Sequence, residues 1–162
     1  MGPAIIVTAE PESICPGDSS TLIAYCTAQT FNWAPGLSLS STTTSSTLAF
    51  PLVTTTYTVT ADNNGCISTA DITVVVEPLP QVDFTADVRE GCQGLTVNFK
   101  DLTTPQAVSW LWNFGENSPF GNTSFFQDPT HYYLDAGSFD VSLSVVTSAG
   151  CRMKMLYPDY IL

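Results

Sequence analysis

The sequence predicts an all-β protein made of two sandwich domains in tandem, and three observations support this fold class. Short stretches of alternating apolar and polar residues recur along the chain, separated by turn signals rich in Pro, Gly, Asn and Asp. The 162 residues include 16 Ser and 22 Thr, and Thr favours strands while Ser favours turns. The two halves also repeat one arrangement of cysteine and tryptophan.

The first half is expected to contain six short strands. The predicted ranges are 4–9, 20–25, 30–33, 46–50, 55–61 and 70–77. Turns are expected at 16–18, 35–36 and 62–65, where the sequence reads Pro-Gly-Asp, Pro-Gly and Asp-Asn-Asn-Gly. The Ser- and Thr-rich segment 38–47 fits either a loop leading into a strand or an O-glycosylated segment, and the apolar residues just after it favour the loop.

The internal repeat sets the domain boundary. In each half a Cys-x-Gly motif is followed 18 residues later by a Trp, and a Gly-Cys pair stands near the end between two strand-like stretches. These residues are Cys15, Trp33 and Cys66 in the first half, and Cys92, Trp110 and Cys151 in the second. The Pro-rich segment 77–81 between them predicts a short, stiff linker. The expected domains are therefore 4–78 and 82–162.

Three motifs of the second half resemble those of the PKD domain, a small immunoglobulin-like β-sandwich. They are Trp-Leu-Trp-Asn-Phe-Gly at 110–115, Asp-Pro-Thr-His-Tyr-Tyr at 128–133 and Ala-Gly-Ser-Phe-Asp-Val-Ser-Leu-Ser-Val at 136–145. Asn113 and the Glu-Asn pair that follows Gly115 depart from the family's acidic and Gly positions, which places a cation site there in doubt. The resemblance implies an extracellular module that spaces, displays or adheres.

The first half resembles the immunoglobulin-like modules that precede PKD domains in large surface proteins of gliding bacteroidetes. Ile-Cys-Pro-Gly at 14–17, Phe-Asn-Trp-Ala-Pro at 31–35, the Thr-rich stretch at 54–60 and Asn-Gly-Cys at 64–66 carry this resemblance. It implies a cell-surface adhesin of the gliding-motility type, exported by type IX secretion. The chain also reads as a piece cut from a longer protein.

Two functions follow from these resemblances. The first is a non-catalytic structural and adhesive segment of a large bacterial cell-surface protein. The second is a carbohydrate-binding or spacer module of a secreted enzyme that degrades polysaccharide or protein. The partners implied are neighbouring modules of the same long chain, together with surface glycans or proteins.

The charge of the chain excludes several other partners. The net charge is −11, with only four Lys and Arg residues, and none of these lies in residues 1–78. Binding to nucleic acid requires cations that replace counterions on the phosphates, so nucleic acid is not expected as a partner. Anionic membranes are disfavoured for the same reason, and no apolar run approaches the roughly 20 residues that span a bilayer.

Five cysteines in a Ser- and Thr-rich chain indicate export to an oxidising compartment. The repeat predicts the disulfides Cys15–Cys66 and Cys92–Cys151, each stabilising its small domain by roughly 4 kcal/mol. Cys26 is left over, either as a buried free thiol or as the partner of Cys66 in place of Cys15. No second Cys or His lies at a metal-ligand spacing from it.

No catalytic residues are expected. His131 occupies the histidine position of the PKD motif, where the resemblance implies a structural role, and Gly137-Ser138 lacks the strand-turn-helix context of a nucleophile. The acids of the second half are expected to lie on a solvated edge. A weak Ca²⁺ site is the alternative, since several oxygen ligands could meet at one end of the sandwich; no other cofactor is expected. These acids are Asp83, Asp87, Asp101, Asp128 and Asp140.

Aromatic residues are divided between the core and one loop. Trp110, Trp112 and Phe114 alternate and share one strand face, which favours packing in the core over stacking on a sugar, and Trp33 is interpreted in the same way.

The loop aromatics are Phe120, Phe125 and Phe126. Because loops on rigid scaffolds carry recognition, these side chains either contact a ligand or pack the loop onto the domain.

Overall fold

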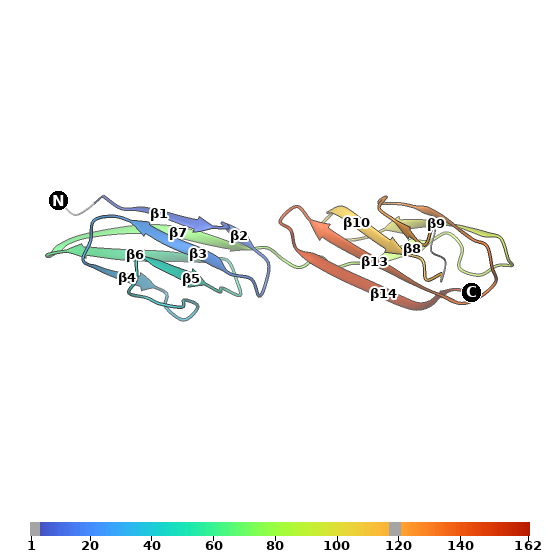
Figure 1. Ribbon diagram of the computed structural model, residues 1–162, viewed down its shortest axis with the longest axis horizontal. Coiled ribbons are helices and arrows are strands. Elements are labelled where there is room, and N and C mark those ends of the chain that lie inside the picture. Colours follow the sequence, from blue (N-terminus) through green and yellow to red (C-terminus); the bar gives the residue numbers. More distant parts are fainter. Residues whose placement is uncertain (1–3, 117–120) are drawn as a thin grey trace. The chain divides into compact units, whose positions relative to one another are not determined.

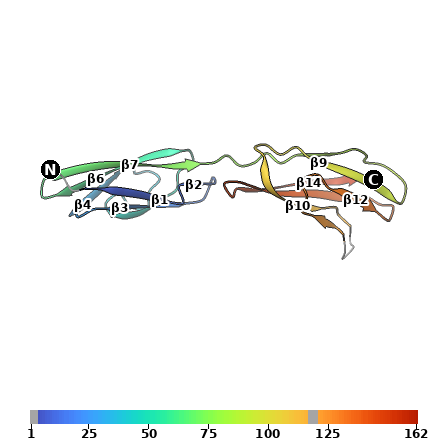
Figure 2. The same ribbon diagram turned by 90° about the horizontal axis from the view of Figure 1, so that it is seen from above.

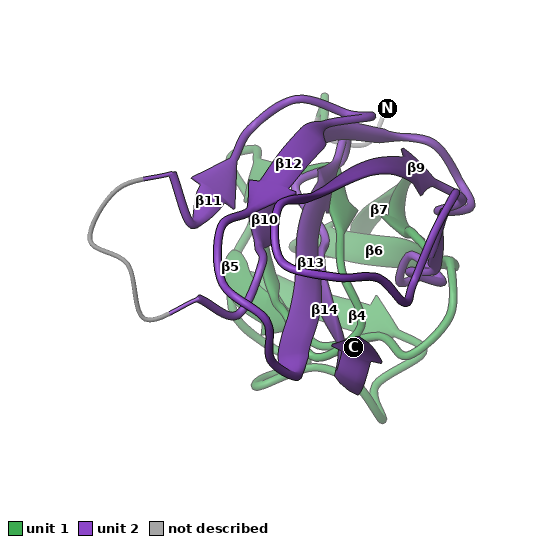
Figure 3. Cartoon of the chain, turned by 90° about the vertical axis from the view of Figure 1, so that its right-hand side faces the viewer, with its two compact units in different colours: residues 1–78 green, residues 79–162 purple. Residues whose placement is uncertain are grey.

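The computed structural model describes residues 4–116 and 121–162. All the elements of regular secondary structure in that part of the chain are β-strands. The chain divides into two compact units, Met1–Pro78 and Leu79–Leu162, drawn in green and purple in Figure 3. Each unit consists of two sheets, which confirms the prediction of two sandwiches in tandem. No helix in the described part is long and apolar enough to cross a membrane.

Unit 1 is a sandwich of a three-stranded and a four-stranded sheet, ordered β1-β3-β5 and β2-β7-β6-β4 (Figure 1). The strands are β1 (Ile6–Glu10), β2 (Ser13–Ile14), β3 (Ser20–Tyr25), β4 (Thr30–Ala34), β5 (Ser46–Ala49), β6 (Thr55–Asn63) and β7 (Cys66–Val76). All pairs are antiparallel except β2 with β7. The chain therefore passes from one sheet to the other between β1 and β2.

The β6–β7 hairpin forms the longest ladder of unit 1, with the two strands side by side in Figure 2. Asn63 pairs with Cys66, so only Asn64 and Gly65 connect the strands. Both have positive φ, 53° and 84°. This is the geometry that Asn-Gly turns adopt, because the turn then follows the right-handed twist of the strands. β7 consequently begins four residues earlier than the predicted strand 70–77.

The core of unit 1 is built around Trp33 and Tyr57, which are 2% and 0% exposed. The polar atom of each side chain has a partner: Trp33 Nε1 donates to the carbonyl of Thr44 at 2.8 Å, and the Tyr57 hydroxyl shares a 2.6 Å hydrogen bond with Ser38. Burial of a ring together with a satisfied polar atom is what makes such residues stabilising. The expectation that Trp33 lies in the core is confirmed.

Unit 2 repeats this plan with sheets ordered β12-β9-β8 and β11-β10-β13-β14. The strands are β8 (Phe84–Ala86), β9 (Leu95–Asp101), β10 (Ala107–Asn113), β11 (Thr123–Ser124), β12 (Thr130–Tyr133), β13 (Phe139–Thr147) and β14 (Arg152–Ile161). Every pair is antiparallel. β11 is a short edge strand at the periphery of the unit (Figure 3).

The core of unit 2 is rich in aromatic rings. Trp112 and Phe114 are 0% and 1% exposed, and Phe84 packs edge-on against Trp112 with ring centroids 5.0 Å apart. Trp110 is partly buried and packs against the same cluster. The alternating aromatics Trp110, Trp112 and Phe114 therefore pack in the core, as expected.

The chain enters and leaves unit 1 at opposite ends of the sandwich. β1 begins at Ile6, which pairs with Tyr25, and β2 continues in the same direction until Ile14 pairs with Val76 at the end of β7. We call the end where the chain enters the proximal end and the end where it leaves the distal end. Because β2 and β7 are parallel, β7 also runs from the proximal to the distal end.

Unit 2 has the same polarity. Gln81 pairs with Thr104 at the proximal end, where the amide of Thr147 also donates to the carbonyl of Cys151. At the distal end the amide of Leu162 donates to the carbonyl of Arg89 at 2.8 Å. Between these ends β14 spans the length of the sandwich beside β13.

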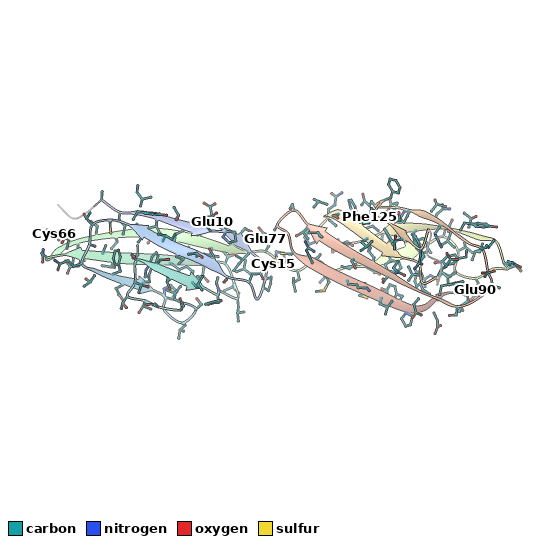
Figure 4. All side chains as sticks on the ribbon, in the orientation of Figure 1. Glu10, Cys15, Cys66, Glu77, Glu90 and Phe125 are labelled. Atoms are coloured by element: carbon teal, nitrogen blue, oxygen red, sulfur yellow. The ribbon has the colours of Figure 1, made fainter. Side chains whose placement is uncertain are left out.

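The predicted disulfide Cys15–Cys66 is wrong, because the two residues lie at opposite ends of unit 1 (Figure 4). Cys15 follows Ile14 at the distal end, whereas Cys66 is the first residue of β7 at the proximal end. Eleven strand residues separate the ends by roughly 33 Å, and cysteines whose Cα atoms are more than about 7 Å apart cannot be bridged. Cys15 is disulfide-bonded, while Cys66 is an exposed free thiol.

The predicted disulfide Cys92–Cys151 is wrong for the same reason. Cys92 follows Gly91, whose amide donates to Leu162 at the distal end of unit 2, and Cys151 stands at the proximal end, before β14. The structure shows Cys151 buried and disulfide-bonded, and Cys92 as an exposed free thiol. Cys26 is a half-buried free thiol, so the alternative pairing of Cys26 with Cys66 is also absent.

Candidate functional site

The loop aromatics of unit 2 point away from the core. Phe125 and Phe126 are 73% and 78% exposed, and Figure 4 shows Phe125 projecting from the unit. The loop is nevertheless anchored, because the indole nitrogen of Trp112 donates to the carbonyl of Phe126 at 3.0 Å. Packing of these two rings into the domain is therefore excluded, and their contact with a ligand remains a prediction. Phe120, the third predicted residue, lies outside the described residues.

Phe125 borders a groove of about 610 Å³ on the four-stranded sheet of unit 2. Residues from β10, β13 and β14 line it. Strand register places Leu111, Ser144 and Lys154 in one row across the three strands. Leu111 is 41% exposed, so this sheet face presents apolar surface to solvent next to the Phe125 ring.

The groove also holds two of the four cationic residues of the chain. Arg152 and Lys154, next-nearest neighbours on β14, both line it. Side chains two apart on a strand share one face, so both cationic chains project from the same side of the sheet. In a protein of net charge −11, this places positive charge beside an exposed aromatic ring.

The groups that line the groove could contact a ligand in two ways. An exposed ring offers a flat apolar surface for a sugar ring or an apolar side chain, and the cations can pair with carboxylates or sulfates. Among the described residues that line the groove, none is an acid, histidine or cysteine that could act as a general base or nucleophile.

His131 has the structural role that the sequence predicts. Its Nε2 lies 3.0 Å from Glu116 Oε2, and its ring stacks on Phe114 with centroids 4.1 Å apart. Burial lowers the pKa of His131 below its ordinary value of 6.5, opposed by the nearby Glu116 charge, which raises it. In the described part of the chain no hydroxyl or thiol is hydrogen-bonded to this imidazole, so the pair lacks a nucleophile to activate.

A second hollow of about 630 Å³ lies where β8 faces the end of β14. Tyr157 and Tyr160 stack there with ring centroids 5.3 Å apart, and the Arg89 guanidinium lies 4.1 Å above the Tyr160 ring. The hydroxyl of Tyr157 donates to Asp83 at 2.7 Å, and this hydrogen bond raises the pKa of Tyr157. Sequence patterns did not predict this cluster, although the Tyr-Pro-Asp-Tyr segment at 157–160 contains both rings.

The scattered acids of unit 2 serve local hydrogen bonds. Asp87 accepts from the backbone and side-chain amides of Asn98, and its pKa is lowered chiefly by the side-chain bond. Asp128 accepts from the amide of Asp101, and Asp140 from the amide of Asp159. Within residues 4–116 and 121–162, no three acids, histidines or cysteines gather as metal ligands. The weak Ca²⁺ site stays a prediction.

Comparison with protein families gives one match, to the family described as PKD domain, over residues 75–157. Two curated proteins are similar over parts of the chain. "Microbial collagenase" of Vibrio alginolyticus is 36% identical over 81 residues, which cover 48% of this chain and 10% of that protein. "Collagenase ColA" of Bacillus cereus is 41% identical over 49 residues, 30% of this chain and 5% of that protein. The chain therefore matches only a small fraction of each relative's length.

Among solved structures, the chain is similar to the N-terminal eight Ig domains of the Down Syndrome Cell Adhesion Molecule. The TM-score is 0.56 at 12% identity, and the match covers 90% of this chain and 25% of that one. At this identity the similarity concerns the fold alone, and it agrees with two immunoglobulin-like sandwiches in succession.

Proposed function

Because this chain belongs to the PKD domain family through residues 75–157, we propose that it is a non-catalytic extracellular module that links and displays. It would form a structural and adhesive segment of a large bacterial cell-surface protein. Its partners would be neighbouring modules of the same chain, together with surface glycans or proteins.

The polarity of the two sandwiches carries this proposal. In each unit the chain enters at the proximal end and leaves at the distal end. Tension between the termini of such a unit acts along the strands, which carry the ladders of the sandwich. A module used as a link in series needs this arrangement, whereas an isolated binding domain does not.

Two further features support an extracellular, structural role. Disulfide-bonded Cys15 and Cys151 are typical of proteins that leave the reducing cytosol. The acidic surface keeps crowded copies apart in solution. The motifs at 14–17 and 31–35 resemble immunoglobulin-like modules of gliding bacteroidetes, which supports a gliding-motility adhesin exported by type IX secretion as the parent protein.

Single-molecule pulling of the whole chain tests the structural role. In the reduced protein, we expect two separate unfolding events at forces well above those of an unstructured chain, one for each sandwich. In the oxidised protein the released length should be shorter, because a disulfide holds closed the segment that it spans. Extension at low force without discrete events would contradict the role as a mechanical link.

The second candidate function is docking of a polymeric substrate for a secreted hydrolase, and the Phe125 groove favours it. Two relatives are named collagenases, and the groove combines an exposed ring with Arg152 and Lys154. A module of this kind would hold an enzyme on insoluble collagen or polysaccharide without taking part in hydrolysis.

Binding assays with matched variants separate the two functions. Phe125→Ala removes the ring that borders the groove, and Phe126→Ala removes an equally exposed ring that does not line it. If the groove docks substrate, binding to insoluble collagen or to a glycan array falls about tenfold in Phe125→Ala and is unchanged in Phe126→Ala, as expected for an aromatic contact worth about 1.4 kcal/mol. Absence of measurable binding by the unaltered chain leaves the structural role as the function. Reproducible hydrolysis of either substrate by the chain would contradict both functions.

A further inference from the structure

We propose that Cys66 and Cys92 are the two halves of a disulfide between modules, formed when Cys92 of one copy of this chain meets Cys66 of a second copy. The proposal rests on which cysteines are disulfide-bonded and which are free thiols. Cys66 and Cys92 are free and exposed, while Cys15 and Cys151 are disulfide-bonded. Exposed free thiols are unusual beside disulfides, since an oxidising environment converts them.

The internal repeat shows that the cysteines form two kinds. Cys15 and Cys92 both begin a Cys-x-Gly motif, and each follows a segment hydrogen-bonded to the last residues of its own unit, at the distal end. Cys66 and Cys151 both follow a Gly at the proximal end. Cys66 is the first residue of β7, and Cys151 directly precedes β14. The two bonded cysteines are one of each kind, and so are the two exposed free ones.

The two disulfide-bonded cysteines, Cys15 and Cys151, show that a cysteine of either kind can form a disulfide. A distal-end cysteine is disulfide-bonded in unit 1, and a proximal-end cysteine is disulfide-bonded in unit 2. The equivalent positions with free thiols are the distal end of unit 2, at Cys92, and the proximal end of unit 1, at Cys66. Neither thiol is disulfide-bonded within its own unit, and the cysteine of the other kind lies at the opposite end of that sandwich.

The contact would be head to tail, because it joins the distal end of unit 2 in one copy to the proximal end of unit 1 in the other. An oligomer bonded in this way still has one unbonded thiol at each end. Repeated bonding therefore yields linear chains of copies, unless the two ends of one chain meet and close a ring. The same chemistry would apply to any further module that carries a proximal-end cysteine, and a second copy of this chain is the defined partner that supplies one.

The bond forms by thiol–disulfide exchange with a small disulfide such as oxidised glutathione. The Cys92 thiolate attacks one glutathione sulfur, which releases one glutathione thiolate and leaves a mixed disulfide. The Cys66 thiolate of the second copy then attacks the Cys92 sulfur and releases the second glutathione. Two protein thiols are oxidised, one glutathione disulfide is reduced, and the two thiol protons pass to the two glutathione thiolates.

The test uses the whole chain at high concentration with oxidised glutathione, followed by non-reducing gel electrophoresis and peptide mapping. We expect a ladder of covalent oligomers that dithiothreitol dissolves, with the Cys66–Cys92 peptide as the main cross-link. Random pairing of two equally reactive thiols would place only half of the bonds in the mixed peptide, so a clear majority is required. Mapping of the unaltered chain needs no variant to fold.

Serine variants sharpen the test. Cys66→Ser and Cys92→Ser should each lose the ladder alone, while a mixture of the two should give a dimer and nothing larger. Cys26→Ser is the matched control and should keep the full ladder. Three outcomes would overturn the proposal. They are a Cys66–Cys92 peptide that makes up only half of the cross-links, a Cys66–Cys92 bond within one chain, and an unaltered chain that forms no more cross-links than the single variants.

Discussion

At the scale of single residues, backbone geometry determines which amino acid unit 2 accepts at position 115. Gly115 ends the aromatic motif that begins on β10 and has φ of 82°, in the left-handed region that L side chains avoid. A Cβ atom at this position would lie against the backbone oxygen of Asp140 and 2.7 Å from its nitrogen. The PKD motif thus requires Gly here for two reasons, the backbone conformation and the close approach of β13.

We predict that Gly115→Ala destabilises unit 2 by about 3 kcal/mol or more, because backbone atoms must move as well as adopt a strained φ. Gly150→Ala is the matched control. Gly150 has φ of 86°, but a Cβ there meets nothing within 4 Å, so its cost should be only about 1 kcal/mol. Urea unfolding followed by tryptophan fluorescence measures both; equal costs would show that the contact with Asp140 is unimportant.

His131 gives the protein a pH dependence between neutral and mildly acidic conditions. Burial lowers its pKa in the folded state below 6.5. As the pH falls through about 6.5 the unfolded chain takes up the proton first, so the free energy of unfolding decreases until the folded-state pKa is reached. Above that window the residue contributes no pH dependence.

We predict that the proton NMR signal of this single histidine titrates below pH 6.5. In Glu116→Gln it should titrate lower still, because the nearby charge that raises its pKa is removed. The unfolding free energy should drop from pH 7.5 to 5.5 in the unaltered chain and much less in His131→Gln. A midpoint at or above 6.5 would show that the Glu116 charge outweighs burial.

At the scale of elements, side-chain carboxylates fasten strands of opposite sheets. Asp101 ends β9, and its Oδ2 accepts from the indole nitrogen of Trp110 on β10 at 2.7 Å. Its Oδ1 accepts from the amide of Thr103 at 2.9 Å. One carboxylate therefore joins the two sheets at the proximal end of unit 2 and fixes the connection between β9 and β10.

We predict that Asp101→Ala lowers the stability of unit 2 by about 2 to 3 kcal/mol, since it leaves the Trp110 and Thr103 donors without this partner. Asp135→Ala, at an exposed acid outside this network, should change stability by less than about 0.5 kcal/mol. Thermal unfolding of the two variants side by side gives the answer. A loss in Asp101→Ala no larger than in the control would mean that the strands hold this geometry unaided.

At the scale of the whole molecule, the cysteines divide into free thiols and disulfide-bonded residues. We predict that alkylation of the native, unreduced chain labels Cys66 and Cys92 rapidly, because both are exposed free thiols. Cys15 and Cys151 should be labelled only after reduction. Mass spectrometry of the digested protein identifies each site, and protection of Cys66 before reduction would restore the pairing expected from the repeat.

The sequence by itself determined the class, the two-fold repeat and the identity of the core. Alternating patterns, Asn-Gly at 64–65 and the motifs around Trp33 and Trp112 act through local geometry and burial, which neighbouring residues in the chain specify. It also singled out the loop of Phe125 and Phe126 as an alternative recognition site, and the structure shows both rings exposed.

Only the tertiary structure decided what depends on residues far apart in sequence. Repeat equivalence shows that Cys15 and Cys92 are alike, but not that a strand of 10 or 11 residues separates each from the Gly-Cys pair of its own unit. The groove beside Phe125 likewise exists only because sheet register aligns β10, β13 and β14. Distance along a folded sheet is set by pairing between strands, and spacing in the sequence does not contain it.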